Sequence, residues 1–179
     1  MTHEPLPRDF AGGRLRRLRR ADLADFQAYR ASPELGRYQG WSPMADPQAL
    51  AFIDEMGAMT AFAPGEWMQI GIAAADTDRL VGDIGIFIAA DSALAEIGFT
   101  LETAAQGRGV ATSAVDAALR LVFEMTPVRQ VRAITDTRNL PSLRLIERLG
   151  FRHDATHRTV FRGEPCDEAT YVLARGPSR

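Results

Sequence analysis

Three apolar segments that follow one another in the middle of the chain constrain the fold most. They span residues 67–74, 80–89 and 94–101, and each has the length and composition of a strand. The turns between them are short and polar, with Asp76-Thr77-Asp78 in the first and Asp91-Ser92 in the second. Strands joined by such turns are antiparallel neighbours, so we expect a three-stranded meander.

A glycine-containing turn and a long helix follow the meander. Residues 106–109 form the turn, and from Val110 to Glu124 apolar side chains recur at helical spacing. Residues 128–135 contain the next strand pattern. Residues 139–149 are helical in pattern, and Gly150 then ends the helix.

The two ends of the chain complete a mixed pattern. The N-terminal side has a strand at 14–18, a helix after Asp22 and a second helix from Asp46-Pro47. At the C-terminal side, residues 151–156 and 170–173 are predicted strands around an irregular loop. This order predicts an α/β fold that is neither a strict βαβ repeat nor an all-β barrel.

We expect one domain, over residues 14–175. Residues 1–13 show little apolar periodicity and are expected to form a flexible N-terminal arm, and residues 176–179 a tail. No apolar run approaches the roughly 18 residues that a membrane-spanning helix needs. With one cysteine and no signal-peptide pattern, the expected location is cytoplasmic and no intramolecular disulfide can form.

Composition excludes several classes of protein. All 21 basic residues are arginine, so the lysine of a phosphate-binding P-loop and the Schiff-base lysine of a pyridoxal-phosphate enzyme are both missing. The net charge of −2 argues against a protein built mainly to bind nucleic acid. An RNA-binding patch would have to come from the arginines at positions 14, 16, 17, 19 and 20, but alternate residues of a strand point to opposite faces.

The turn before the long helix predicts an anion site. Gly107 and Gly109 let the backbone approach a ligand closely, and the helix start presents free N–H groups and a positive dipole end. Arg108 and Thr112 add donors. A dinucleotide-binding fingerprint does not fit, because its third glycine is missing and the turn follows the fourth strand of the chain.

Two motifs resemble the GCN5-related N-acetyltransferase (GNAT) superfamily. Gln106-Gly107-Arg108-Gly109-Val110-Ala111 is similar to the family's Q/R-x-x-G-x-G/A turn, and residues 139–151 to its second signature, a helix between an Asn and a Gly-Phe. Residues 14–16, 32–34, 80–85 and 95–99 resemble the RimJ/RimL-like branch, which acetylates the N-termini of ribosomal proteins.

The resemblance implies a fold and a co-substrate. The fold would be of the acyl-CoA N-acyltransferase type, with a central mixed, mostly antiparallel sheet of about seven strands flanked by about four helices. Acetyl-CoA would lie where the fourth and fifth strands splay apart, and no metal is implied. The expected contact residues are Phe99, Thr100 and Leu101 beside the pantetheine arm, Asn139 on its other side, and Gln106, Gly107, Arg108, Gly109, Val110, Ala111 and Thr112 around the pyrophosphate.

The expected reaction is direct attack of an amine on the thioester. Glu96, mid-strand among apolar neighbours, is the best candidate for a general base; the alternatives are that it holds an arginine or a backbone group, or that a water chain takes the proton. Many family members use a tyrosine as the acid, and the matching position here is Ile146. The RimJ/RimL-like branch offers a hydroxyl near the sulfur at the position of Ser142, so the resemblance implies Ser142 as hydrogen-bond donor or acid, the alternative being that a small residue is needed there for helix packing.

The acceptor is expected to be a primary amine, with a protein or peptide N-terminal α-amine as the leading class. Tyr38 and Trp41 would border the acceptor cleft, with residues 157–167 as its other wall. The alternatives are a polyamine, amino acid or antibiotic amine, and a non-catalytic acyl-CoA-binding module. We expect neither a Cys166 acyl-enzyme nor a zinc site at His153 and His157. A homodimer is compatible with the family.

Overall fold

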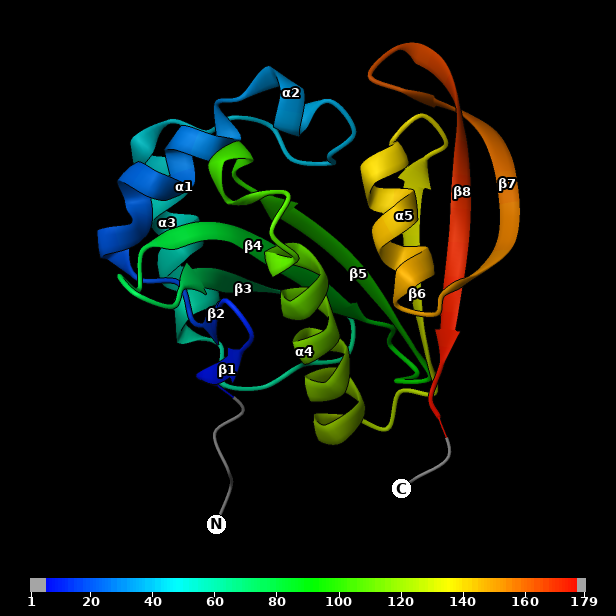
Figure 1. Cartoon of the computed structure of the whole chain (residues 1–179), viewed down its shortest axis with the longest axis horizontal. Coiled ribbons are helices and arrows are strands. Elements are labelled where there is room, and N and C mark those ends of the chain that lie inside the picture. Colours follow the sequence, from blue (N-terminus) through cyan, green and yellow to red (C-terminus); the bar gives the residue numbers. More distant parts are fainter. Residues whose placement is uncertain (1–5, 177–179) are drawn as a thin grey trace.

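A single sheet organises residues 6–176, the part of the chain that the computed structural model describes (Figure 1). Its strand order is β1-β2-β3-β4-β5-β6-β8-β7, and β5 and β6 are parallel while the other neighbours are antiparallel. The strands are β1 (Arg8–Phe10), β2 (Gly13–Arg16), β3 (Trp67–Ala74), β4 (Leu80–Ile88), β5 (Leu94–Leu101), β6 (Gln130–Asp136), β7 (Arg152–Phe161) and β8 (Glu164–Ala174).

Helices lie on both faces of this sheet (Figure 1). On one face α4 packs against β1, β2 and β5, and α5 against β6; on the other, α1 packs against β4 and α3 against β3. The α-helices of the described residues are α1 (Leu23–Arg30), α2 (Pro33–Gly36), α3 (Asp46–Ala58), α4 (Val110–Met125) and α5 (Leu140–Arg148). Within residues 6–176 no helix is both long and apolar enough to cross a membrane.

The predicted meander is confirmed. β3 and β5 have the predicted bounds, β4 ends one residue early at Ile88, and β3, β4 and β5 pair antiparallel in that order. The α/β fold class is confirmed as well. The described residues hold eight strands and five α-helices rather than about seven and about four, because β1 and the one-turn helix α2 were not expected.

The N-terminal arm was predicted too long. Residues 8–10 form β1, which pairs with β2, and the side chain of Leu6 is buried. Residues 1–5 of that arm, and residues 177–179 of the expected tail, lie outside the described residues. The prediction of an arm failed because a three-residue strand is too short to show periodicity.

The irregular loop predicted between the last two strands is also wrong. β7 and β8 form a long hairpin whose register runs from Arg152↔Val172 to Phe161↔Glu164. Its turn is Arg162-Gly163, with φ of +52° and +82°. Two consecutive positive φ values are typical of a tight type I′ hairpin turn, whose usual sequences contain Asn or Asp before Gly. Arginine in that place hid the turn.

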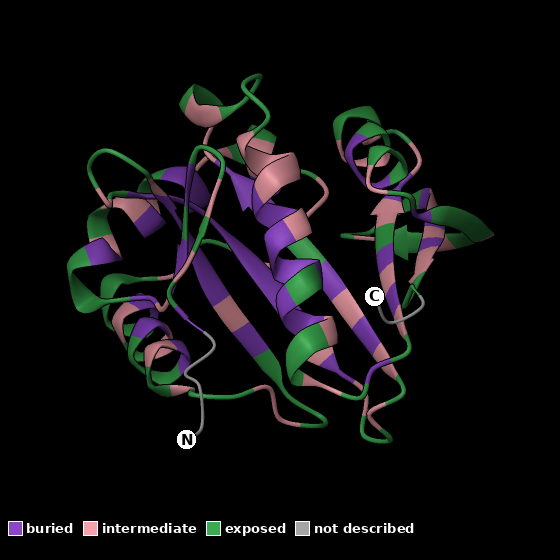
Figure 2. Cartoon of the chain, turned by 60° about the horizontal axis from the view of Figure 1, so that its bottom comes forward, coloured by how far each residue is buried: buried purple, intermediate pink, exposed green. Residues whose placement is uncertain are grey.

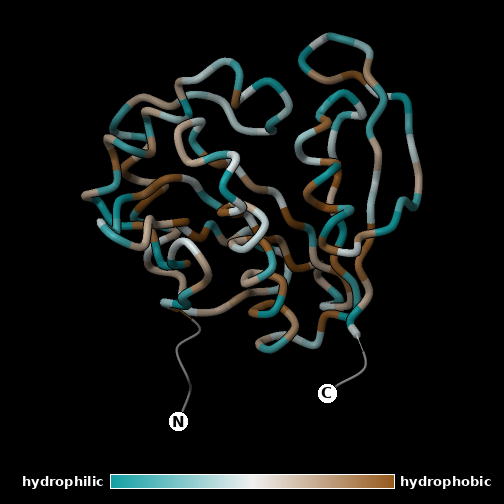
Figure 3. Tube along the Cα trace, in the orientation of Figure 1, coloured by the Kyte–Doolittle hydropathy of each residue, from teal (hydrophilic) through white to brown (hydrophobic). Residues whose placement is uncertain are grey.

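The core lies between the sheet and its helices. One cluster joins the α4 face of the sheet to α4 and α5, and a second joins α1 and α3 to Leu18 and Leu80. Buried residues therefore concentrate in the central strands and on the inner side of α4 (Figure 2). The β7 strand of the outer hairpin is mostly hydrophilic, whereas the hydrophobic residues gather in the central strands and helices (Figure 3).

The N-terminal arginines are largely neutralised within the protein. Arg16 is 3% exposed and donates two hydrogen bonds to the Asp22 carboxylate. Burial of this kind removes Arg16 from any surface patch, and other arginines of the group have acidic partners: Arg14 with Asp9, Arg19 with Asp78 and Arg20 with Asp54. The RNA-binding alternative loses much of its charge in this way.

Candidate functional site

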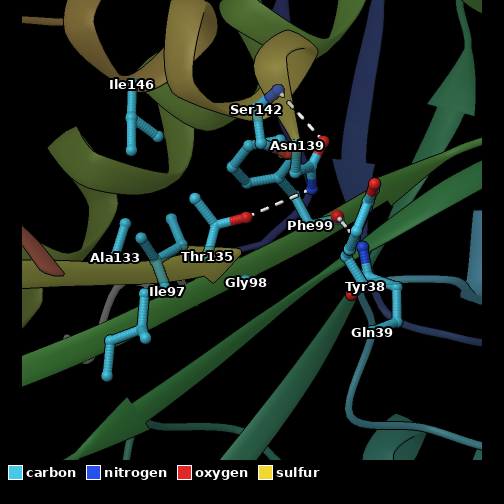
Figure 4. A pocket seen from close by; sticks show the side chains of 11 residues that line it. Tyr38, Gln39, Ile97, Gly98, Phe99, Ala133, Thr135, Asn139, Ser142 and Ile146 are labelled. Atoms are coloured by element: carbon cyan, nitrogen blue, oxygen red, sulfur yellow. Dashed lines mark hydrogen bonds between the residues drawn. The ribbon is translucent and has the colours of Figure 1, made fainter. Parts of the chain in front are cut away.

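The sheet opens between β5 and β6. These strands pair only from Leu94↔Gln130 to Glu96↔Arg132, after which β5 follows β4 and β6 follows β8. The opening is therefore at the fourth and fifth strands as predicted, counted without β1. A pocket fills it (Figure 4), lined by Tyr38, Gln39, Ile97, Gly98, Phe99, Ala133, Ile134, Thr135, Asn139, Ser142 and Ile146.

The edge of β5 that faces this opening is paired with no other described strand after Glu96. The Glu102 N–H donates to the Val81 C=O at 2.8 Å, so these two residues form a hydrogen-bonded pair of the antiparallel β4–β5 ladder. Hydrogen-bonded pairs alternate with non-bonded pairs along such a ladder, and the next bonded pair is Asp83 with Thr100. Thr100 consequently bonds to β4, whereas the N–H and C=O groups of Phe99 and Leu101 point toward the opening. An open strand edge of this kind can pair with an extended, amide-bearing ligand.

The glycine turn lies at the end of this edge and has the predicted backbone. Gly107 and Gly109 both have φ of +77°, and Gly109 is the N-cap of α4 with no side chain capping the helix. The first N–H groups of α4 are thus available to an anion. Gln106 Nε2 donates to Leu101 C=O at 2.9 Å, and exposed Arg108 donates to Ala104 C=O at 2.5 Å. Both side chains hold the turn in place.

Helix α5 forms the opposite wall. Asn139 is its N-cap: its Oδ1 accepts from the Ser142 N–H at 3.5 Å and its Nδ2 donates to Thr135 Oγ1 at 3.2 Å (Figure 4). Ser142 and Ile146 follow at helical spacing and also line the pocket. Ile146 is buried, so the wall is apolar where many relatives are expected to carry tyrosine.

Glu96 lies outside the set of pocket-lining residues. Its side chain is 23% exposed and forms an ion pair at 2.8 Å with Arg132, its register partner on β6. The contact agrees with the alternative interpretation of Glu96, in which its carboxylate holds an arginine in place. The ion pair also closes the narrow end of the opening, because it joins β5 to β6 at the last paired position.

The segment between α2 and α3 covers the other side of the opening. Tyr38 and Gln39 line the pocket. Trp41 does not line it; instead its Nε1 donates to Thr100 Oγ1 at 3.3 Å. The Thr100 side chain therefore points to the α1 face, away from the strand edge.

Arginines surround Tyr38. The guanidinium carbons of Arg37 and Arg138 are 5.2 and 5.9 Å from the centre of its ring. Arg138 also forms two hydrogen bonds to Asp136, and this guanidinium holds the pKa of the Asp136 carboxyl below its ordinary value. Two cationic side chains therefore lie beside Tyr38, and one of them, Arg138, is paired with Asp136.

A buried network of charged and polar side chains packs against the segment between α2 and α3. Asp83 is 1% exposed and accepts from Gln69 Nε2 at 2.6 Å, from Arg30 Nη2 at 3.0 Å and from the Tyr29 hydroxyl. Burial and the neighbouring Asp83 carboxylate raise the pKa of Tyr29 well above its ordinary value. The Arg30 guanidinium stacks 5.0 Å from the Trp41 ring, which links the network to the pocket's cover.

Cys166 is buried, and His153 makes contacts with neighbouring side chains. Cys166 lies in β8 with 6% exposure, and burial raises the pKa of its thiol, which disfavours the nucleophilic thiolate. His153 hydrogen-bonds Thr156 and packs edge-on against Tyr171. Among the described residues no cluster of three His, Cys, Asp or Glu side chains could hold a metal ion.

Sequence reasoning missed four residues of this site: Gln39, Thr135, Arg138 and Arg162. Gln39 donates to Phe99 C=O at 3.1 Å, and Arg162 donates to the carbonyl groups of Gln39 and Trp41. Gln39, Arg138 and Arg162 act through contacts with segments remote in sequence, whereas Thr135 bonds to nearby Asn139. No local pattern signals such contacts.

The fold and site together define a class of protein. An open strand edge runs into an uncapped helix N-terminus, which suits a ligand that combines an amide-bearing arm with a pyrophosphate. The family described as "Acetyltransferase (GNAT) domain" matches residues 14–152. That is well over half of the chain, and the chain belongs to this family.

Named relatives agree with this assignment. The probable N-acetyltransferase YjcK of Bacillus subtilis (strain 168) is 34% identical over 95 residues, so the match spans about half the length of each chain (52% of both).

Solved structures share the fold at lower identity. RimL, a ribosomal L7/L12 α-N-protein acetyltransferase solved in complex with coenzyme A, superposes with a TM-score of 0.79 at 14% identity, over 93% of this chain and 98% of its own. Spermidine N-acetyltransferase from Vibrio cholerae, solved with CoA and spermine, gives 0.78 at 18%, over 92% and 96%. These two proteins act on different amines, so the shared fold does not identify the acceptor.

Proposed function

We propose that this acetyltransferase moves the acetyl group of acetyl-CoA directly to a primary amine, and that the amine is the N-terminal α-amine of a protein or peptide. The observation that carries the proposal is the open edge of β5 leading to the uncapped start of α4. A small amine is the second candidate acceptor, supported by the spermidine N-acetyltransferase among the similar structures.

The residues present fit acetyl-CoA. Backbone N–H groups from Gly107 to Thr112 would receive the pyrophosphate, with Arg108 beside them. The outward-pointing groups of Phe99 and Leu101 would pair with the pantetheine amides, and the Asn139 carboxamide would approach from α5. Bound in this way, acetyl-CoA supplies a thioester carbonyl inside the pocket.

The chemistry requires two proton transfers. As the amine nitrogen attacks the thioester carbon, the C–N bond forms, the C–S bond breaks, and the nitrogen loses a proton while the sulfur gains one. Glu96 is proposed to take the proton, through water, since its side chain does not line the pocket. Ser142, on the pocket wall, is proposed to donate a hydrogen bond to the departing sulfur.

Electrostatics favours an α-amine over a polyamine. Carboxylates near the opening are already held by arginines, namely Asp83 by Arg30, Glu96 by Arg132 and Asp136 by Arg138. A polyamine would bring further cations toward Arg37 and Arg138 beside Tyr38. An α-amine has a pKa of about 7.7–8.0, so at pH 7 roughly a tenth to a sixth of it is neutral without help from a carboxylate, against less than about a thousandth of an alkylamine with a pKa of about 10.4.

The first experiment is a thermal-shift comparison of acetyl-CoA, CoA, NAD and ATP. A ligand at about 100 times its Kd adds about 2.7 kcal/mol of stability, which corresponds to roughly 5–11 °C in a chain of this size. We expect the rise with acetyl-CoA and CoA alone. A rise only with NAD or ATP would refute the proposed co-substrate.

The second experiment measures CoA release with N-terminal peptides, spermidine and free amino acids. We expect the highest kcat/KM with a peptide α-amine, and no CoA release with any amine would favour the non-catalytic binding module. In the Ser142→Ala variant kcat should fall about tenfold or more, the usual effect of losing one transition-state donor, with acetyl-CoA affinity unchanged. An unchanged kcat would leave Ser142 as a packing residue.

A further inference from the structure

The segment that covers the pocket is tied to the sheet edge by two side chains of its own. Gln39 Nε2 donates to the Phe99 carbonyl at 3.1 Å, and Trp41 Nε1 donates to Thr100 Oγ1 at 3.3 Å (Figure 4 shows the Gln39 contact). The Phe99 carbonyl is one of the groups on the open edge of β5. Gln39 therefore lies directly beside the place proposed for the thioester.

A third contact comes from the β7–β8 hairpin, on the other side of the opening. Arg162, in the turn of the β7–β8 hairpin, donates from Nη2 to the carbonyl groups of Gln39 and Trp41 at 3.1 and 2.6 Å. More than 120 residues of chain separate the partners in each of these bonds. One guanidinium thus joins the two segments that flank the opening in the sheet (Figure 1).

The position of Arg162 is fixed by the hairpin. Its φ of +52° is set by the tight turn, and the turn is set by the β7–β8 pairing, which is in register from Ala155↔Thr170 to Phe161↔Glu164. The Arg162 guanidinium also lies 5.1 Å from the Phe161 ring. Both hydrogen bonds come from the Nη2 atom at the tip of the side chain, and lysine would carry its donors one bond nearer the backbone.

We propose that Arg162 is a positioning residue for the acceptor. By holding the main chain of residues 39–41 against the hairpin, it keeps Tyr38 and Gln39 on the pocket wall beside the proposed thioester. This bridge shapes the side from which the amine enters. Its contacts lie on the main chain of residues 39–41 and not on the glycine turn or the start of α4, where the pyrophosphate is proposed to bind, so we expect its effect on acceptor binding. The proposal rests on the proposed function and adds to it.

The test compares Arg162→Ala and Arg162→Lys with Arg152→Ala. Arg152 is an exposed arginine at the other end of the same hairpin, opposite Val172 and outside the predicted acceptor wall, and serves as the matched control. Alanine keeps the β-carbon and therefore the same backbone strain as arginine at position 162. Each variant is assayed for acetyl-CoA Kd by calorimetry and for acceptor KM and kcat with the best amine of the CoA-release screen.

We expect Arg162→Ala to raise acceptor KM about tenfold, the usual effect of losing charged hydrogen bonds, with acetyl-CoA Kd unchanged. Arg162→Lys should recover only part of this, and Arg152→Ala should match the wild type. An acceptor KM that stays at the wild-type value, or a loss confined to acetyl-CoA affinity, would overturn the proposal.

A second readout needs no turnover. The chain has two tryptophans, so in a Trp67→Phe background Trp41 alone reports on the bridge. Arg162→Ala should shift Trp41 emission to the red as the segment loosens, and unchanged emission would count against the bridge. Failure of the proposed function appears separately, as a wild-type protein that does not bind acetyl-CoA.

Discussion

Replacement of Gly109 by alanine tests the glycine turn most directly. Gly109 is the N-cap of α4 with φ of +77°, and a β-carbon added there would meet no atom within 4 Å. Steric overlap is therefore absent, and the substitution acts only through backbone conformation. An L-residue in the left-handed region costs about 1–2 kcal/mol.

The free-energy cost of this left-handed backbone should appear as weaker acetyl-CoA binding. If the turn relaxes to a negative φ to escape the strain, the N–H groups before α4 no longer converge, and binding must restore the strained form. A penalty of about 1–2 kcal/mol corresponds to a Kd raised roughly 5–30-fold. Calorimetric titration of acetyl-CoA measures this change.

Gly40 provides the matched control. It also has open space where a β-carbon would lie, and its φ is outside the left-handed region. Gly40→Ala should therefore leave acetyl-CoA affinity at the wild-type value. Equal Kd values for Gly109→Ala, Gly40→Ala and the wild type would refute the assignment of the turn as the pyrophosphate site.

Three further predictions follow from the charged groups. Asp83→Asn should lower the free energy of unfolding by about 3–5 kcal/mol in urea titrations, because it leaves the buried Arg30 cation without its carboxylate; a loss below about 1 kcal/mol would contradict this. Glu96→Gln should lower kcat at saturating amine, and an unchanged kcat would exclude Glu96 as the base. The pKa of Asp136 is lowered by Arg138, so this pair contributes stability above the ordinary carboxyl pKa that is lost as pH falls through the lowered value. The stability difference between wild type and Arg138→Gln should accordingly be constant from pH 5 to 7 and shrink below about pH 4; a difference that grows on acidification would contradict it.

Prediction from sequence succeeded where the signal was local. The bounds of β3 and β5, the start of α4 and the positive φ at Gly107 and Gly109 follow from apolar segments bounded by polar turns, helical periodicity and glycine placement. Each of these patterns is written into neighbouring residues. The family resemblance used the same local motifs.

The unpredicted parts depend on contacts between distant segments. The strand β1 exists because β2 pairs with it, and the turn at Arg162-Gly163 exists because β7 and β8 stay in register to their ends. Trp41 faces Thr100 and not the pocket, since the segment is held by three separate elements.

By itself the sequence determined the α/β class, the meander, the glycine turn before α4 and the absence of lysine chemistry, because composition and short-range periodicity carry that information. Only the tertiary structure decided which backbone groups of β5 point away from β4, that Glu96 pairs with Arg132, and that Arg162 joins the β7–β8 hairpin to residues 39–41. Those facts depend on strand register and on the docking of segments far apart in the chain, and no local pattern encodes either.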